Sequence, residues 1–379
     1  MTAGDPTRDD DSGQGGLTAH LRRRIAVEGP ISVAAFMAEA LGHPRHGYYI
    51  TADRFGAAGD FVTAPEISQM FGELIGLWCA HTWTEIGAPD PVNLVELGPG
   101  RGTLMRDALR AAAMVSKFRD AAAVHLVETS PVLRERQRAM LEPVLKGNGP
   151  TWHDTLATVP DGPVLVIANE FFDALPIRQF QKTAHGWTER MVDVDDATGG
   201  FRFVLDRRPG PVEHAIPPSA RTAAPGSVFE TCPAATAIAH ELGARLERSG
   251  GAALIIDYGH PRSAVGETLQ AVRRHAFAPV LDAPGSADLT AHVDFEALAN
   301  AARDAGARAW GPVTQGAFLA GLGIRERAAL LRRRATPGQA IDIDSAVHRL
   351  IDDTGMGTLF KVLALTDPRR PAPAGFEPA

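Results

Sequence analysis

The stretch "VELGPGRGTL", residues 95–104, decides the fold of this chain. An acidic residue, Glu96, is followed by three glycines at alternate positions, Gly98, Gly100 and Gly102. The apolar run "PVNLVEL" leads into the loop, and the helix-like run "TLMRDALRAAAM" follows it. A strand, a glycine turn and a helix in this order form the context in which a nucleotide-binding loop is expected.

The glycine spacing separates two possible cofactors. A NAD fingerprint, G-x-G-x-x-G, would need its third glycine at position 103, which is Thr103. The G-x-G-x-G form after an acid suits S-adenosylmethionine better. This cofactor carries a sulfonium, an amino-acid end and a ribose, and glycines let the backbone approach all three closely. We therefore expect Glu96 and the three glycines to bind S-adenosylmethionine.

The composition is that of an ordinary globular protein, with 379 residues, 45% of them hydrophobic and 22% charged. This length allows one large domain or two ordinary ones. The net charge of -7 argues against a nucleic-acid partner, which requires a basic surface. Cys79 and Cys232 are too few for a disulfide framework and form no C-x-x-C zinc motif, so reduced core thiols are expected.

The expected location is the cytoplasm. The first residues, "MTAGDPTRDDDSGQGG", lack the apolar segment of a signal peptide, and their aspartates disfavour a mitochondrial presequence. No run approaches the roughly 18 apolar residues of a membrane span, so no membrane insertion is expected. The sequence leaves the oligomeric state unknown.

Four segments are predicted along the chain. Residues 1–16 form a polar tail that is expected to be disordered. A helical segment spans 17–88, and the main domain spans 89–370. A β-rich insertion at about 175–250 interrupts the main domain.

The main domain alternates strand-like and helix-like patterns from residue 92 onward. The strand candidates are short apolar runs, as expected for parallel strands that are covered on both faces. They lie at 92–97, 123–128, 163–168 and 252–257, and "TLFKVLALT" (358–366) is read as a closing strand. The pattern predicts an α/β fold with a mostly parallel, doubly wound sheet and with ligands at the carboxyl ends of the strands.

Two acids stand at the ends of predicted strands: Glu128 closes the second strand, and Asp154 comes just after a short third strand in "TWHDTL", residues 151–156. Glu128 lies 30 residues after Gly98 and can accept two hydrogen bonds from ribose hydroxyls. NAD enzymes use the same device, so Glu128 alone does not name the cofactor. Asp154 could accept a hydrogen bond from an adenine amino group, or it could cap the helix that follows it.

The fourth strand ends in "ANEFFDALP", residues 168–176, where the methyl acceptor is expected to meet the sulfonium. Glu170 and Asp173 could hold a guanidinium group and aim one of its nitrogens at the methyl carbon. A second interpretation compares N-E-F-F with the N-P-P-Y type of loop, in which Asn169 would accept from a planar amino group and Phe172 would stack on it. A solvated strand-end turn is the third alternative. Asn169 is also a candidate for cofactor binding.

Two later stretches carry further polar residues. "IIDYGH" (255–260) ends the fifth strand with Asp257 and the third tyrosine of the chain. In "DLTAHVDFEAL" (288–298) four polar residues alternate and could face one side of an extended segment; they are Asp288, Thr290, His292 and Asp294. His292 is included among the candidate catalytic groups. Their spacing matches no metal-ligand motif, and no metal is expected.

Residues 43–66 carry two tyrosines, Tyr48 and Tyr49, and several glycines. Thr63-Ala64-Pro65-Glu66 predicts a helix start with a capping box. We expect this segment to fold over the cofactor pocket and shield the sulfonium from water. The alternative is a surface loop that packs away from the site.

Several long motifs occur in order and resemble the MidA-type family, bacterial relatives of a mitochondrial complex I assembly factor that is a protein arginine methyltransferase. They include "GDFVTAPEISQMFGELIG", "LVELGPGRGTLMRD", "HLVETSP", "NEFFDALPIRQFQKT", "GGAALIIDYGH", "PGSADLTAHVDF" and "GPVTQGAFLAGLGI", and the resemblance covers roughly residues 25–365. It implies a class I methyltransferase fold, S-adenosylmethionine as cofactor, and symmetric dimethylation of a protein arginine as the mitochondrial member's activity.

Transferred by motif, the resemblance implies cofactor binding by the three loop glycines and Glu128, and acceptor contacts by Glu170 and Asp173. It suggests a bacterial, cytoplasmic protein whose partner is a protein substrate, such as a complex I subunit. Two hypotheses remain open. The chain is either a protein arginine methyltransferase or a methyltransferase-fold assembly chaperone that grips a partner without essential catalysis.

Overall fold

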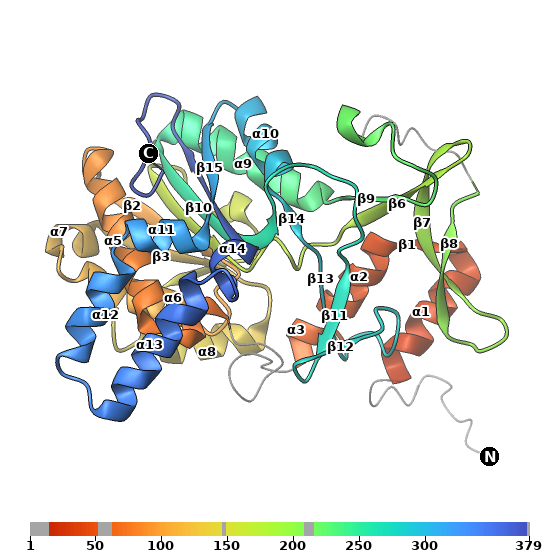
Figure 1. Ribbon diagram of the computed structural model, residues 1–379, viewed down its shortest axis with the longest axis horizontal. Coiled ribbons are helices and arrows are strands. Elements are labelled where there is room, and N and C mark those ends of the chain that lie inside the picture. Colours follow the sequence, from red (N-terminus) through yellow and green to blue (C-terminus); the bar gives the residue numbers. More distant parts are fainter. Residues whose placement is uncertain (1–14, 52–62, 146–148, 208–215, 377–379) are drawn as a thin grey trace, which may run out of the picture.

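The computed structural model describes residues 15–51, 63–145, 149–207 and 216–376. The predicted tail, apart from its last two residues, therefore lies outside the described chain. Figure 1 shows two lobes side by side, a larger lobe built on a long sheet and a small lobe that contains the N-terminal helices. Within the described residues, no helix is both long enough and apolar enough to cross a membrane.

The large lobe contains an eight-stranded sheet in the order β15-β16-β10-β5-β2-β3-β4, with β14 attached to β10. Its strands are β2 (Val92–Leu97), β3 (Ala122–Val127), β4 (Thr151–His153), β5 (Val164–Asn169), β10 (Gly251–His260), β14 (Val293–Asp294), β15 (Arg308–Thr314) and β16 (Phe360–Thr366). From β4 to β10 the pairing is parallel, whereas β16 runs antiparallel to both of its neighbours. The doubly wound α/β sheet, its predicted strands and the closing strand are thereby confirmed.

The apolar runs became central strands because both faces of the sheet are covered. All six residues of β2 are buried, and their side chains divide between two cores. Val92 and Leu94 pack in the first core, with helices on one face, and Val95 and Leu97 pack in the second core, with helices on the other face. The first set comprises α5 (Gln69–Glu85), α6 (Thr103–Ala112), α7 (Ser116–Ala121), α8 (Pro131–Leu141), α11 (Gln315–Gly321), α12 (Ile324–Arg332) and α13 (Pro337–Ile351), and the second set comprises α9 (Pro233–Ser249) and α10 (Phe295–Asp304).

The small lobe combines segments that lie far apart in the sequence. One sheet has the order β1-β7-β6-β9, with β8 pairing with β7, and another has the order β12-β11-β13. The strands are β1 (Ile31–Ser32), β6 (Arg178–Thr183), β7 (Gly186–Val194), β8 (Phe201–Leu205), β9 (Val228–Thr231), β11 (Gln270–Arg273), β12 (Ala276–Ala278) and β13 (Asp288–Thr290). The helices α1 (Gly15–Glu28) and α2 (Val33–Gly42) share a core with these sheets. The N-terminal helices thus pack with the β-rich part of the predicted insertion, residues 178–231. The predicted end of the insertion near residue 250 is wrong, because residues 233–249 form α9 and pack in the second core of the large lobe.

The remaining helical elements of the described chain are short. They are α3 (Tyr48–Thr51), α4 (Ala64–Ile67), α14 (Met356–Leu359) and two 3-10 turns, η1 (Leu156–Thr158) and η3 (Pro218–Ala220). Pro65 stands in the first turn of α4, but the predicted capping box is wrong. Thr63 makes no side-chain cap, and the Glu66 carboxylate instead accepts a 2.5 Å hydrogen bond from the hydroxyl of Thr103.

Candidate functional site

A cavity of about 650 Å³ opens where the carboxyl ends of β2, β3, β4 and β5 meet the small lobe. Segments that follow all four strands line it, together with residues of α2, α3 and α4. This is the edge of a doubly wound sheet at which ligands are expected. Seven candidate residues from the sequence line the cavity together: Glu96, Gly98, Gly100, Glu128, Asp154, Asn169 and Glu170.

The glycine loop requires backbone conformations that other residues adopt poorly. Gly98 has a φ of 61° and Gly100 a φ of 53°, both in the left-handed region. A Cβ atom added to Gly98 would lie 2.8 Å from Cδ2 of Phe171. The carbonyl oxygen of Gly100 accepts a 2.7 Å hydrogen bond from the Gln137 side chain, which fixes the loop against α8. Gly102, also with a positive φ of 84°, stands at the N-cap of α6 and is not among the residues that line the cavity.

Two buried acceptor atoms belong to residues that line the cavity. Within the described chain, Oε2 of Glu96 and Oδ1 of Asn169 have no hydrogen-bond partner. Burial raises the pKa of Glu96 to about 8. Buried polar atoms normally find a partner, so both atoms suit a ligand that brings a donor group, such as the ammonium of an amino-acid end.

Glu128 lies just beyond the end of β3. Its Oε1 accepts from the backbone N–H of Ser130 at 2.8 Å, and its Oε2 accepts from Nε2 of Gln137 at 3.1 Å. Burial raises the pKa of Glu128, although these hydrogen bonds oppose the shift. Each carboxylate oxygen keeps a further lone pair for a ribose hydroxyl, so the position agrees with the predicted role.

Asp154 follows β4, and its carboxylate lies against Arg134. Nη2 of Arg134 donates to Oδ1 of Asp154 at 2.6 Å and also contacts the carbonyl oxygen of Glu128. The next helical turn, η1, has Thr155 as its N-cap and has no side-chain cap. The helix-capping alternative therefore loses its support, and recognition of adenine by Asp154 stays a prediction.

Replacing Glu128 with alanine should weaken binding of S-adenosylmethionine by roughly 1.5–3 kcal/mol, the range for hydrogen bonds to a charged group. Titration calorimetry measures this change directly. Glu135→Ala is a matched control, because Glu135 is an exposed acid on α8 that pairs with Arg138. Equal affinities of Glu128→Ala and the wild type would contradict the role of Glu128.

The turn that follows β5 carries the residues that the sequence predicts for the acceptor. Glu170 has an unusual positive φ of 51°, and its backbone N–H donates to the carbonyl of Ile256 at 2.9 Å. Its Oε1 accepts from the backbone N–H of Ala64 at 3.0 Å and from Nδ2 of Asn169 at 3.1 Å. Burial raises the pKa of Glu170 to about 7. A strained backbone that holds a buried acid at a cavity is typical of a functional site.

Asp257 holds this turn in place, a role that the sequence did not predict. Its side chain is fully buried, and its Oδ2 accepts from three consecutive backbone N–H groups, those of Phe171, Phe172 and Asp173, at 3.2, 3.0 and 3.2 Å. The acid in "IIDYGH" was the available signal, because a carboxylate is unusual within a central strand. Asp257 therefore fixes the backbone of the turn that follows β5.

Asp173 is buried beside Glu170 but is not among the residues that line the cavity. Its Oδ2 accepts a 2.7 Å hydrogen bond from the hydroxyl of Tyr258, while its Oδ1 has no partner within the described chain. Burial raises the pKa of Asp173 to about 6, and the hydrogen bond from Tyr258 opposes this shift.

The alternating residues of 288–298 serve different purposes. His292 packs its ring edgewise on Tyr258, with centroids 5.5 Å apart, and does not line the cavity. Asp288 accepts from the hydroxyl of Tyr49 at 2.7 Å, and Asp294 caps α10. His292 thus contacts Tyr258 rather than the cavity, and a catalytic role of His292 stays a prediction.

A different group within the described residues has metal-type donor atoms within 4.8 Å of one another, namely His20, Glu39 and His43. Nη1 of Arg24 already contacts Oε1 of Glu39 at 3.0 Å. Nδ1 of His43 accepts backbone N–H groups from Arg45 and His46, both at 3.2 Å. These hydrogen bonds account for the group as a polar cluster, and we assign no metal to it.

Both described ends of the predicted cover lie at the cavity. Tyr49 and Ile50 line it from α3, and Thr63, Pro65 and Glu66 line it from α4. Residues 52–62, between these ends, lie outside the described residues. The surface-loop alternative therefore does not hold for the two ends.

Adding S-adenosylmethionine should slow amide hydrogen exchange at residues 47–51 and 63–67, because ligand binding stabilises the segments that close around it. Mass spectrometry of exchanged peptides measures this protection. The groove between α12 and α13, which shares no lining residue with the cavity, serves as the internal control. Protection of the glycine loop without any change in these two segments would contradict the cover.

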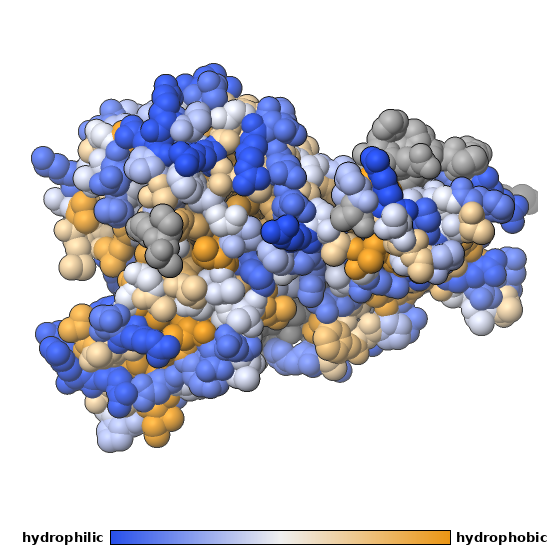
Figure 2. Space-filling model, turned by 45° about the horizontal axis from the view of Figure 1, so that its top comes forward, coloured by the Kyte–Doolittle hydropathy of each residue, from blue (hydrophilic) through white to orange (hydrophobic). Residues whose placement is uncertain are grey.

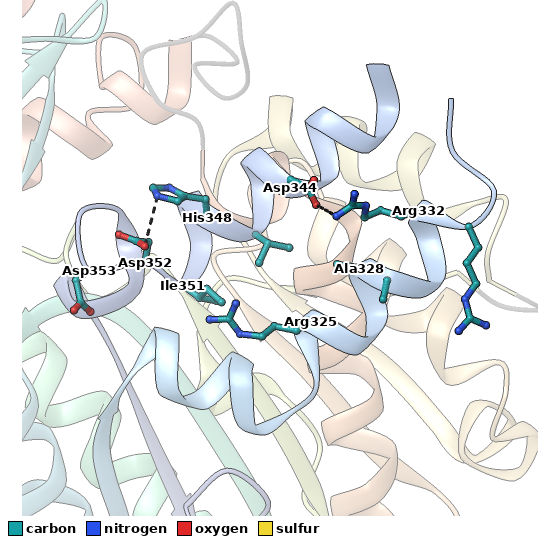
Figure 3. Close-up of a pocket in the computed structure, with 11 residues that line it drawn as sticks. Arg325, Ala328, Arg332, Asp344, His348, Ile351, Asp352 and Asp353 are labelled. Carbon is teal, nitrogen blue, oxygen red and sulfur yellow. Dashed lines mark hydrogen bonds and ion pairs between the residues drawn. The ribbon is translucent and has the colours of Figure 1, made fainter. Parts of the chain in front are cut away.

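A second, open groove of about 900 Å³ lies between α12 and α13 and shares no lining residue with the first cavity. Its charged side chains are partly paired within it, as Figure 3 shows for Arg332 with Asp344 and for His348 with Asp352. Figure 2 shows a mainly hydrophilic face with scattered apolar groups, some at the end that carries these helices. Nothing in this groove indicates a particular ligand.

A family model described as "Putative S-adenosyl-L-methionine-dependent methyltransferase" matches residues 74–313. The chain is 40% identical to the Drosophila melanogaster protein named protein arginine methyltransferase NDUFAF7 homolog, mitochondrial, over 383 residues, covering 94% of this chain and 86% of that protein. It is 38% identical to the Homo sapiens protein arginine methyltransferase NDUFAF7, mitochondrial, over 376 residues, covering 93% and 84%.

A solved structure is similar over nearly the whole chain. It is a Burkholderia thailandensis protein bound to S-adenosyl-homocysteine, and it covers 99% of this chain and 98% of its own. The TM-score is 0.83 at 32% sequence identity. S-adenosyl-homocysteine is the product that S-adenosylmethionine leaves after methyl transfer, which agrees with the ligand that the glycine loop predicts.

Proposed function

The chain belongs to this family of S-adenosyl-L-methionine-dependent methyltransferases, and we propose that it methylates arginine side chains of a protein partner. The cofactor is S-adenosyl-L-methionine. The features that fit it are the left-handed glycine turn, the acceptor atoms of Glu96 and Asn169 without partners, and Glu128 at the position of a ribose ligand. When bound, the cofactor supplies the methyl group and the leaving thioether.

The observation that carries the proposal for arginine is a set of buried acids around one turn. Burial raises the pKa of Asp257, and the nearby charges of Asp173 and Glu170 raise it further. Buried like charges are costly unless a cation compensates them. A guanidinium suits this place, because it is always charged and presents a planar fork of donors to carboxylates.

In this proposal the chain's residues bind and orient the acceptor and take up one proton. Glu170, which lines the cavity, accepts from the guanidinium N–H groups. Asp173 does not line the cavity, and in this proposal its Oδ1, which has no partner within the described residues, is the second acceptor. The two acids aim one nitrogen at the cofactor end of the cavity. Methylation of a guanidinium nitrogen releases a proton from that nitrogen. Glu170 is suited to receive it, because burial raises its pKa to about 7.

The amino-group interpretation receives less support. Phe172 is buried in the second core of the sheet and would have to leave it to stack on a substrate ring. The amide nitrogen of Asn169 donates to Glu170, which makes Asn169 a neighbour of the acid. The names of the similar proteins also favour arginine as the acceptor.

The proposed partner is a subunit of respiratory complex I, as the family resemblance implies. We expect the enzyme to act in the bacterial cytoplasm. Cys79 and Cys232 are free thiols, and free thiols are typical of a reducing compartment. Under the chaperone hypothesis the chain would bind the same partner, but methyl transfer would not be essential. Mass spectrometry of complex I from cells with and without this gene would identify the modified subunit.

The direct test is transfer from methyl-labelled cofactor to host protein, followed by analysis of the labelled amino acid. Label on arginine supports the proposal. Label on lysine, glutamine or nucleic acid contradicts it and restores the amino-group interpretation. Absence of label, with the partner still bound, favours the assembly chaperone.

The rate should depend on pH through Glu170. Because burial raises the pKa of Glu170 to about 7, this carboxyl is protonated below that pH and cannot hold a guanidinium by charge. The value of kcat/KM, which reports groups of the free enzyme, should therefore rise as pH increases through about 7 and then level off. Initial rates across the neutral range measure the profile. A flat profile, or the same rise in Glu170→Gln, would contradict this assignment.

A further inference from the structure

Tyr49 is fixed at two points. Its hydroxyl donates to Oδ1 of Asp288 at 2.7 Å, and its ring meets Tyr48 edge to face with centroids 5.1 Å apart. Tyr48 is almost fully buried in the core of the small lobe. A long aromatic side chain that is anchored at its tip and supported along its ring has little rotational freedom.

Tyr49 stands at the cavity on the side of the proposed acceptor acids. Tyr49 lines the cavity together with Glu170. The pKa of Tyr49 is raised by burial and then by the charges of Asp288 and Asp173, which places both acids near its hydroxyl. The segment of Asp288 is joined to the turn that follows β5, because the backbone N–H of Ala291 donates to the carbonyl of Asp173 at 3.0 Å.

A second tyrosine shows the same pairing but a different position. The hydroxyl of Tyr258 donates to Asp173 at 2.7 Å, and its ring packs between His292 and Phe360. Tyr258 is not among the cavity-lining residues, whereas Tyr49 is. Of the two phenols, Tyr49 is therefore the one whose ring can meet a ligand in the cavity.

We propose that the Tyr49 ring is the platform on which the substrate guanidinium stacks beside Glu170, and that Asp288 is a positioning residue that holds this ring. A planar cation binds well over an aromatic face, and arginine does so more often than lysine. The Tyr49 ring would then orient the plane of the guanidinium while the acids bind its edge. This inference rests on arginine methylation as the proposed function.

The ring and its anchor can be separated by substitution. Tyr49→Leu removes the platform and should lower kcat/KM for an arginine-containing peptide on the order of 10-fold, within the range of about 2- to 30-fold that a cation–π contact allows. Tyr49→Phe and Asp288→Ala keep the ring but remove its hydrogen-bonded anchor, so each should have a smaller effect. The double variant should lose little more kcat/KM than either single variant, because both substitutions remove the same hydrogen bond.

The experiment measures kcat and KM with methyl-labelled cofactor and an arginine-containing peptide, cofactor affinity by calorimetry, and thermal unfolding. Phe277→Leu is the matched control, because Phe277 is an exposed aromatic residue on β12. We expect cofactor affinity within about threefold of the wild type in all variants, a difference below ~0.7 kcal/mol. A purely structural role of Asp288 would lower the unfolding temperature without the shared, non-additive loss of kcat/KM.

Two outcomes overturn the inference. One is Tyr49→Leu with wild-type kcat/KM, and the other is a loss of cofactor affinity as large as the loss of rate, which would make Tyr49 a wall of the cofactor site. If the wild type labels no arginine, the proposed function itself fails, and the stacking role fails with it. If the wild type labels arginine and Tyr49→Leu does so equally well, only the stacking role fails.

Discussion

Replacing Glu170 with glutamine should slow methyl transfer about 30- to 1,000-fold, which corresponds to ~2–4 kcal/mol of lost transition-state stabilisation. Glutamine keeps the shape of the side chain, and its carbonyl oxygen can still accept from the backbone N–H of Ala64. It removes the charge that grips the guanidinium and the base that receives its proton. Cofactor affinity should stay within about threefold, since the change spares the glycine loop and Glu128.

Single-turnover rates with labelled cofactor, together with calorimetry on the same preparation, separate the two effects. Glu135→Gln is the control, because it removes an exposed acid of the same type on α8. Equal losses of rate and of cofactor affinity in Glu170→Gln would show that Glu170 supports the cofactor rather than the acceptor. An unchanged rate would remove Glu170 from the mechanism.

Replacing Gly100 with valine should abolish cofactor binding. Gly100 has a φ of 53°, a conformation that a β-branched residue adopts only with strain, and it lines the cavity where the cofactor approaches. A cofactor affinity in the micromolar range, about -7 to -8 kcal/mol, is expected for the wild type. Calorimetry with the valine variant should show no measurable heat of binding.

The control for backbone strain is Gly226→Val. Gly226 also has a positive φ, of 92°, but a Cβ there would meet no atom within 4 Å, and the residue does not line the cavity. This variant should bear a similar conformational cost and still bind cofactor. Normal cofactor binding by a folded Gly100→Val variant would refute the assignment of the loop.

The sequence predicts the large lobe well because the signals for its strands and its glycine loop each lie within a few consecutive residues. Each central strand is an apolar run that is bounded by turn residues, and the glycine loop shows in six consecutive positions where strand and helix meet. The candidates at strand ends follow from the same logic. Parallel strands bring their carboxyl ends to one edge, so Glu96, Glu128 and Asn169 reach one cavity although they are far apart in sequence.

The contacts that escaped prediction join distant segments through single side chains. β1 has only two residues, and it finds its partner β7 in a segment about 160 positions later, where Ile31 pairs with Val192. Asp257 is a single acid within an apolar strand, and only the fold reveals the three N–H groups from which it accepts hydrogen bonds. The hydrogen bond from Tyr49 to Asp288 spans 239 positions. Periodicity carries no information about such pairs.

In the segment around His292, the sequence pattern suggested a regularity that the structure does not have. The alternation of His292 with Asp288 and Asp294 suggested a common face, but the segment is only partly extended. β13 ends at Thr290, β14 starts at Val293, and Asp294 already caps a helix. The period-two argument requires one uninterrupted strand, and this segment does not provide it.

The most direct measurement of the central claim is a crystal structure with S-adenosyl-homocysteine and an arginine-containing peptide bound. The account predicts ribose hydroxyls against Glu128, the amino-acid end near Glu96 and Asn169, and the guanidinium held by Glu170 and Asp173. A guanidinium bound away from these two acids, or a ribose bound away from Glu128, would contradict it.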